Sequence, residues 1–99
     1  NLDPSLLMWD MRRHLVPTSL PKHRCTMKFI YPEISAGRKT WWVLIEKNQV
    51  DVCAVDPGYE IDLLVRSSLR SMRSVWMGMT TLKSEIEAGS TVDARVAGA

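Results

Sequence analysis

The sequence Asp56-Pro57-Gly58 marks a tight turn between two segments that have the composition of β-strands. Proline presets the backbone φ angle at the second position of such a turn, and glycine accepts the positive φ that a type II turn requires. Residues 50–55 are rich in valine, and residues 59–66 alternate apolar with polar side chains, so the sequence predicts a strand on each side of the turn. The predicted inward face of the second strand consists of Tyr59, Ile61, Leu63 and Val65.

Three further segments, 24–31, 39–46 and 91–96, show the same alternation of apolar and polar side chains. Short connections join the first four of the five predicted strands, which favours an antiparallel meander. Large side chains fill the segment 39–46, where Trp41, Val43 and Ile45 share one predicted face of the strand.

The N-terminal segment predicts a helix that begins at Asp3-Pro4, because Asp is a good N-cap and Pro is tolerated at the first helical position. This helix has two apolar patches, so it needs two packing partners. One is its own sheet, and the other is an upstream domain or a second subunit. The first patch consists of Leu7, Met8, Met11 and Leu15, and the second consists of Leu6 and Trp9.

Two more helices are predicted in the second half of the chain. One begins at Ser67 or Ser68 and ends at Gly78, and the other runs from Thr80 or Thr81 to Gly89. The sequence thus predicts an α+β fold, with a mostly antiparallel five-stranded sheet covered on one face by helices. The apolar face of the first of these helices consists of Leu69, Met72, Val75 and Trp76.

The 99 residues are sufficient for a single domain, which we expect to span 1–99. No apolar run approaches the roughly 20 residues of a membrane span, and the N-terminus has no signal-peptide pattern. A formal net charge of +2 does not by itself indicate nucleic-acid binding. Because the chain starts at Asn1 without an initiator Met, we expect it to be a fragment of a longer protein.

Residues that could perform catalysis or bind metal show no suitable spacing. His14 and His23 have no second His or Cys at ligand spacing, and no Ser or Cys is paired with an activating base. Cys25 and Cys53 lie among apolar neighbours, which is typical of buried thiols. We therefore expect no enzyme activity, no catalytic or metal-binding residues and no cofactor.

Arg66, Arg70 and Arg73 form a basic stripe on the outer face of the helix that begins near Ser68. Such a stripe is compatible with phosphate binding. A solvated helix face explains it more simply, because no aromatic or glycine-rich partner accompanies it. We therefore expect no direct nucleic-acid binding by this chain.

Six methionines and four tryptophans are a heavy apolar load for this length. Methionine is flexible and adapts to varied partners, so such side chains between helices and a sheet could line a pocket for a lipid-sized molecule. For most of these residues taken individually, filling a solid core is the simpler interpretation, and one sequence does not separate the two. The residues concerned are Met8, Trp9, Met11, Met27, Trp41, Trp42, Met72, Trp76, Met77 and Met79.

The ordered set of the Asp-Pro-Gly turn and its strands, Trp76-Met77-Gly78 and Ala88-Gly89 resembles the sterol-carrier-protein-2-like domain. The form it resembles lies C-terminal to the winged helix of HxlR-type bacterial transcription regulators. The resemblance implies a container for an apolar small molecule or lipid, without catalytic machinery, in a cytoplasmic regulator whose DNA-binding domain lies outside this chain. The ligand-binding residues expected on this basis are Met11, Trp41, Met72, Trp76 and Met77.

Two departures from the family pattern affect these expectations. Met79 follows Gly78 where the family commonly has Asp, and the sequence ends at Ala99, before the family's last helix. Because an uncovered apolar face tends to recruit a partner, we expect a homo-oligomer. The alternative function is a structural dimerisation or packing domain with a filled core.

Overall fold

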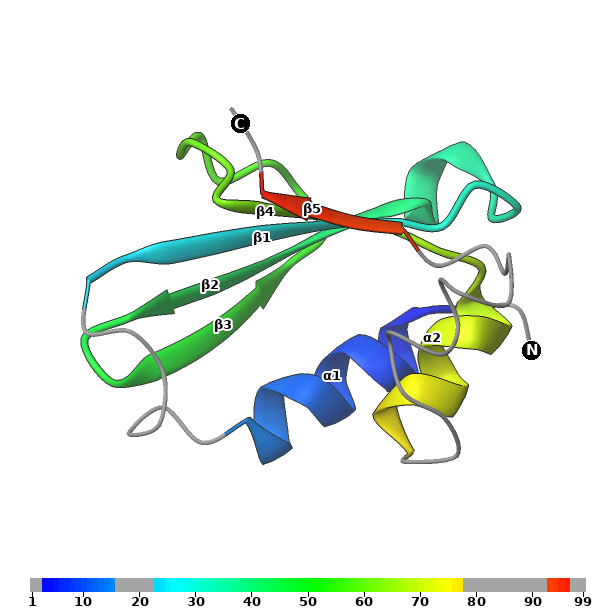
Figure 1. Cartoon of the computed structure of the whole chain (residues 1–99), viewed down its shortest axis with the longest axis horizontal. Helices are drawn as coiled ribbons and strands as arrows, with labels where there is room; N and C mark the ends of the chain where they lie inside the picture. The colour runs from blue at the N-terminus through cyan, green and yellow to red at the C-terminus, as the bar shows by residue number, and fades with distance from the viewer. Residues whose placement is uncertain (1–2, 16–22, 78–92, 97–99) are drawn as a thin grey trace.

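The computed structural model describes residues 3–15, 23–77 and 93–96, in which two α-helices pack against one β-sheet (Figure 1). The elements in chain order are α1 (Ser5–His14), β1 (Cys25–Ile30), the 3-10 helix η2 (Ala36–Arg38), β2 (Thr40–Glu46), β3 (Gln49–Cys53), β4 (Leu63–Arg66), α2 (Leu69–Trp76) and β5 (Asp93–Val96). The predicted helix from Thr80 or Thr81 to Gly89 lies outside the described residues.

The sheet is mixed, with strand order β3-β2-β1-β4-β5. β1 pairs antiparallel with β2 but parallel with β4, and β4 pairs antiparallel with β5. The predicted mostly antiparallel pairing is therefore wrong, because the sheet is mixed and β4 runs parallel to β1. The fold is α+β, and both described helices lie on one face of the sheet (Figure 1).

The error arises in the connection between β3 and β4. Residues 54–62 contain no helix or strand, so the predicted strand 59–66 is reduced to its last four residues. The connection lies on the face of the sheet away from the helices (Figure 1). It brings β4 beside β1 instead of β3. Since β3 and β4 run in the same direction, a crossover must connect them, because a tight turn cannot join parallel strands.

Polar contacts hold this connection in place. The Asp62 N–H donates to the carbonyl oxygen of Thr26, and the Thr26 N–H donates to Asp62 Oδ2, both at 2.8 Å. At the predicted turn, Gly58 has φ of 88°, and its N–H donates to Asp56 Oδ1 at 2.8 Å. The turn chemistry predicted for Asp56-Pro57-Gly58 is therefore present, but within a crossover.

The first three strands follow the predicted antiparallel order. β2 and β3 are joined at Lys47 and Asn48, which have positive φ of 52° and 61°. Positive φ at both central residues is the geometry of a type I′ hairpin turn, whose twist matches that of the flanking strands. Asn tolerates this conformation better than most residues, which explains its place here.

Both described helices begin with a side-chain hydrogen bond. The Ser5 N–H donates to Asp3 Oδ1 at 3.0 Å, so the predicted bond to Asp3 is present, although Pro4 and not Asp3 occupies the N-cap position. In α2, the Ser71 N–H donates to Ser68 Oγ at 3.1 Å. Glu33 adds a second cap from outside the helix, because its Oε2 accepts from the Leu69 N–H at 2.8 Å.

The core lies between the helices and one face of the sheet. Met8 and Tyr31 are fully buried, and the Tyr31 hydroxyl donates to Met8 Sδ at 3.1 Å. Burial raises the pKa of Tyr31 far above its ordinary value, so the hydroxyl stays protonated and available as a donor. The remaining buried members of the core are Leu7, Met11, Phe29, Ile34, Trp41, Val43, Ile45, Val50, Val65, Leu69 and Met72.

The two predicted patches of α1 have different environments. Leu7, Met8 and Met11 are buried, whereas Leu6 is 80% exposed and Trp9 is 43% exposed. The predicted second apolar patch is thus present on the surface of the described structure. The Arg12 guanidinium lies over the Trp9 ring, 5.5 Å from its centroid, and covers part of it.

We predict that Met8→Ala lowers the free energy of unfolding by about 2–5 kcal/mol, because it leaves a cavity in a fully buried site and removes the acceptor of the Tyr31 hydroxyl. Urea unfolding followed by circular dichroism measures this change. Leu6→Ala on the same helix is the matched control and should stay within about 0.5 kcal/mol of wild type. Equal losses in the two variants would contradict the described orientation of α1.

Candidate functional site

A cavity of about 220 Å³ lies between the two described helices and the sheet. It is partly open to the surface, and all of its described lining residues are apolar. Among the lining residues that the structure describes, none is charged or bears a hydroxyl group. The lining residues are Met11, Leu15, Met27, Phe29, Val43, Leu63, Val65, Met72, Val75 and Trp76.

The periodicities of helix and strand place these side chains around the cavity. Met72, Val75 and Trp76 occur at spacings of three and four on α2, so they share one helical face. From the sheet, the parallel register of β1 and β4 pairs Met27 with Leu63 and Phe29 with Val65. Each pair places two apolar side chains side by side on the face of the sheet that the helices cover.

The structure brings together three of the five predicted ligand-binding residues. Met11, Met72 and Trp76 all line the cavity. Trp41 instead fills the core, where its indole N–H donates to the carbonyl oxygen of Arg38 at 2.8 Å. Met77 lies beyond the end of α2, is 65% exposed, and lines a groove on the outer side of the helices.

Of the strand residues that line the cavity, only Met27 was among the pocket candidates predicted from the sequence. Leu63 and Val65 stood on the predicted inward face of their strand, and Met27 and Phe29 share one face of the predicted strand 24–31, so alternation did give their orientation. It did not give their proximity, because the predicted meander placed the segment 59–66 beside β3. Val75 also lines the cavity; the sequence placed it on the apolar face of its helix, but it was not among the predicted ligand-binding residues.

Trp76 connects α2 to α1 through a hydrogen bond from its indole N–H to Asp10 Oδ2 at 2.7 Å. Asp10 Oδ1 accepts a second bond from Arg13 at 3.1 Å, and His14 Nδ1 lies 3.2 Å from the same oxygen. The hydrogen bonds from Trp76 and then Arg13 lower the pKa of Asp10 below its ordinary value. The carboxylate therefore remains ionised at neutral pH and keeps both bonds.

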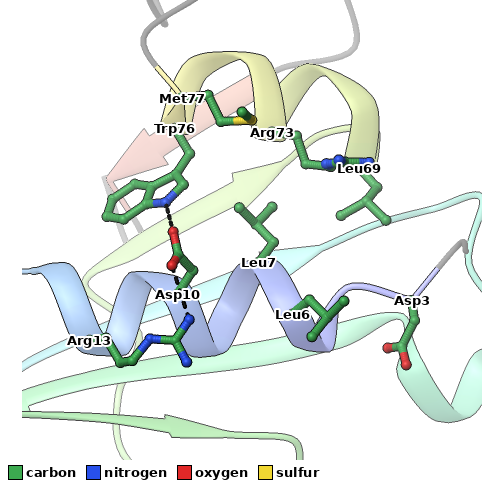
Figure 2. A pocket seen from close by; sticks show the side chains of 9 residues that line it. All are labelled: Asp3, Leu6, Leu7, Asp10, Arg13, Leu69, Arg73, Trp76 and Met77. Atoms are coloured by element: carbon green, nitrogen blue, oxygen red, sulfur yellow. Dashed lines mark hydrogen bonds and ion pairs between the residues drawn. The ribbon is translucent and has the colours of Figure 1, made fainter.

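A second hollow, of about 530 Å³, lies between α1 and α2 on their outer side (Figure 2). Trp76 belongs to both hollows: it lines the apolar cavity and also the outer groove. Figure 2 shows the side chains of Asp10 and Trp76 pointing toward one another across the groove. The groove is lined by Asp3, Leu6, Leu7, Asp10, Arg13, Leu69, Arg73, Trp76 and Met77.

Within the described ranges, no group of three or more His, Cys, Asp or Glu residues is placed to hold a metal ion. The two cysteines are unpaired, and desolvation raises the pKa of both Cys25 and Cys53. Their thiols are therefore poor nucleophiles at neutral pH. Among the residues with a described structure, no helix is long and apolar enough to cross a membrane.

Neither a family model nor a curated protein matches this chain. Solved structures do match, among them two of the sec-alkylsulfatase PisA1. A double mutant of that enzyme is similar with a TM-score of 0.78 at 13% identity over 98% of this chain. The stereoselective inverting sec-alkylsulfatase from Pseudomonas sp. is similar with a TM-score of 0.77 at 14% identity, also over 98% of this chain. In both cases this chain corresponds to only 15% of the enzyme's length, so the likeness concerns the fold of one segment.

We predict that Trp76→Phe raises the pKa of Asp10 toward its ordinary value, because the substitution removes the strongest hydrogen bond to the carboxylate. A lowered pKa in the folded state means that this carboxylate stabilises the fold above the unfolded pKa and ceases to do so as pH falls through the folded pKa. The variant should therefore lose less stability on acidification than wild type. An NMR titration of the Asp10 carboxyl carbon measures the pKa directly.

The control for this measurement is Trp9→Phe, which changes an indole next to Asp10 on α1 that makes no hydrogen bond to it in the described structure. The pKa of Asp10 should stay at its wild-type value in Trp9→Phe. An unchanged pKa in Trp76→Phe as well would show that the bond between the two helices does not form in solution.

Proposed function

We propose that this domain binds the apolar part of a small molecule in the cavity between α1, α2 and the sheet. The observation that carries the proposal is that all described lining residues of the cavity are apolar, at a volume of about 220 Å³. An apolar cavity of roughly 150 Å³ can already stay dry and bind benzene. Because water finds no hydrogen-bond partner in the lining, an apolar ligand has little competition for this space.

The size of the cavity limits what it accepts. Sites that enclose a drug-sized ligand begin at roughly 300 Å³, above the 220 Å³ available here. The cavity therefore suits a small apolar molecule or one end of a longer one. Met11, Met27 and Met72 line three sides of it, from α1, β1 and α2, and their flexible side chains can adjust to ligands of different shape.

We propose binding without a chemical step. No acid, base or nucleophile is among the described residues that line the cavity, so these residues offer nothing to activate a bound molecule. Two settings are compatible with such a module. The resemblance in sequence suggests a cytoplasmic regulator in which the ligand acts on an attached winged helix. The likeness to part of a sec-alkylsulfatase suggests an accessory segment of a larger enzyme that handles molecules with alkyl chains.

A structural role as a dimerisation domain is supported by a separate observation. Leu6 and Trp9 expose apolar surface on α1, on the side away from the sheet. Sedimentation at tens of micromolar, with and without an added apolar ligand, separates the two functions. A dimer that binds no ligand favours the structural role, and a monomer that binds one favours the container.

We predict that Val75→Phe weakens the binding of Nile red, a neutral dye whose fluorescence rises in apolar surroundings, at least about tenfold, which corresponds to about 1.4 kcal/mol. The larger side chain would occupy the cavity that Val75 lines, without removing any core contact. The free energy of unfolding should stay near that of wild type, because the added ring fills existing space.

Val55→Phe is the matched control, since Val55 is 78% exposed in the connection before the Asp-Pro-Gly turn and lies outside the cavity. Its affinity for the dye should equal that of wild type. If wild type does not bind the dye, or if Val75→Phe and Val55→Phe bind it equally, the cavity is not the binding site.

A further inference from the structure

The groove between α1 and α2 differs in character from the apolar cavity behind it. Its apolar floor is built by Leu6, Leu7, Leu69 and Met77, of which Leu6 and Met77 are 80% and 65% exposed. Charged side chains from both helices stand around this floor (Figure 2). An apolar floor with a charged rim suits a ligand that is itself amphipathic.

The charged side chains around the groove differ in whether they have an ion-pair or hydrogen-bond partner. Asp3 Oδ2 accepts from Arg38 at 3.0 Å. Asp10 is engaged by Trp76 and Arg13. Both carboxylates of the groove are therefore neutralised by groups already in place. Arg73 has no carboxylate partner among the described residues, so its guanidinium leaves an excess of positive charge at the rim.

A neighbouring hollow of about 130 Å³ extends this positive region. It is lined by Arg70, Arg73, Ser74 and Met77 on the outer side of α2. Arg70, like Arg73, is exposed and has no carboxylate partner in the described part of the chain. An anion is therefore attracted to this end of the groove, and a cation is repelled from it.

The groove and the cavity share Trp76 as a common wall. Arg73 lies three residues before Trp76 on α2, which places their Cβ atoms about 5–6 Å apart. The cavity holds only about 220 Å³, so a longer ligand must leave part of itself outside. A part that passes Trp76 would lie beside the Arg73 guanidinium, which has no carboxylate partner among the described residues.

We propose that the groove binds the anionic head group of a single-chain amphiphile whose apolar tail occupies the cavity, with Arg73 as the residue that pairs with the head. This inference rests on the proposed function, because it extends the same ligand out of the cavity. The guanidinium is planar and presents parallel N–H donors that match a carboxylate or a sulfate, so the shared chemistry of the head is an oxyanion.

Three ligands with the same alkyl chain test the proposal: decyl sulfate, decanoate and 1-decanol, each used below its aggregation threshold to displace Nile red. We expect both anions to bind wild type more tightly than the neutral alcohol. Arg73→Gln should weaken the binding of the anions about fivefold, as for an exposed charge pair, and leave that of 1-decanol unchanged. The anion with the larger loss identifies the head group, sulfate or carboxylate.

Arg66→Gln is the matched control, because it removes the same charge from an exposed position that lines neither hollow. It should change none of the three affinities. Added salt should reduce the advantage of the anions over 1-decanol in wild type and much less in Arg73→Gln.

The outcomes separate the two proposals. Equal affinities of wild type for all three ligands, unchanged in Arg73→Gln, overturn the anionic head site and leave the apolar cavity standing. If Arg73→Gln weakens the binding of 1-decanol as much as that of the anions, the substitution acts through the structure. This result also overturns the head site. Failure of all three ligands to displace the dye from wild type overturns both proposals.

Discussion

The parallel pairing of β1 with β4 determines the position of almost everything that surrounds the cavity. At one end, Asp62 and Thr26 exchange two hydrogen bonds of 2.8 Å, and at the other end the Ser67 N–H donates to the Ile30 carbonyl oxygen at 3.1 Å. Between these points, the register sets Leu63 and Val65 beside β1. Since α2 begins shortly after β4, the same pairing also directs the helix whose side chains cover the cavity.

The hydrogen bond between Trp76 and Asp10 complements this pairing on the helical side. It fixes the indole between two hollows, one with an entirely apolar lining and one with a charged rim. A tryptophan suits this place because its ring is apolar while its N–H requires a partner. Trp41 has the same requirement, but meets it at the carbonyl of Arg38 beside η2, so it serves the core and not the cavity.

The sequence predicted well which way the side chains point, but it predicted poorly which strands are neighbours. Alternation placed Trp41, Val43 and Ile45 on one face of β2, and all three join the core. The helical stripes placed Met11, Met72 and Trp76 toward the sheet, and all three line the cavity. An alternation with period two indicates which face of the strand a side chain lies on, but not which strand is its neighbour. The predicted order of strands in a meander was therefore wrong.

Two of the predicted ligand-binding residues, Trp41 and Met77, lie outside the apolar cavity, for different physical reasons. Trp41 lies on an inward face, where pocket-lining and core-filling side chains have the same pattern in one dimension. Met77 follows the last residue of α2, and its direction is no longer set by the helical period. Tyr59 and Ile61 continued the alternation of a strand, but the backbone there belongs to the crossover and not to the sheet.

The crossover between β3 and β4 also affects how the chain folds. The bonds between Thr26 and Asp62 close a loop across 36 positions of sequence, whereas the hairpin of β2 and β3 closes at Lys47 and Asn48. The entropy cost of closure rises only slowly with length, by about 0.6 kcal/mol for each doubling. Stability therefore depends little on the length of the connection, whereas the rate of folding falls as contacts become more distant in sequence. The apolar cavity, which needs both β1 and β4, belongs to the part of the molecule that assembles through these distant contacts.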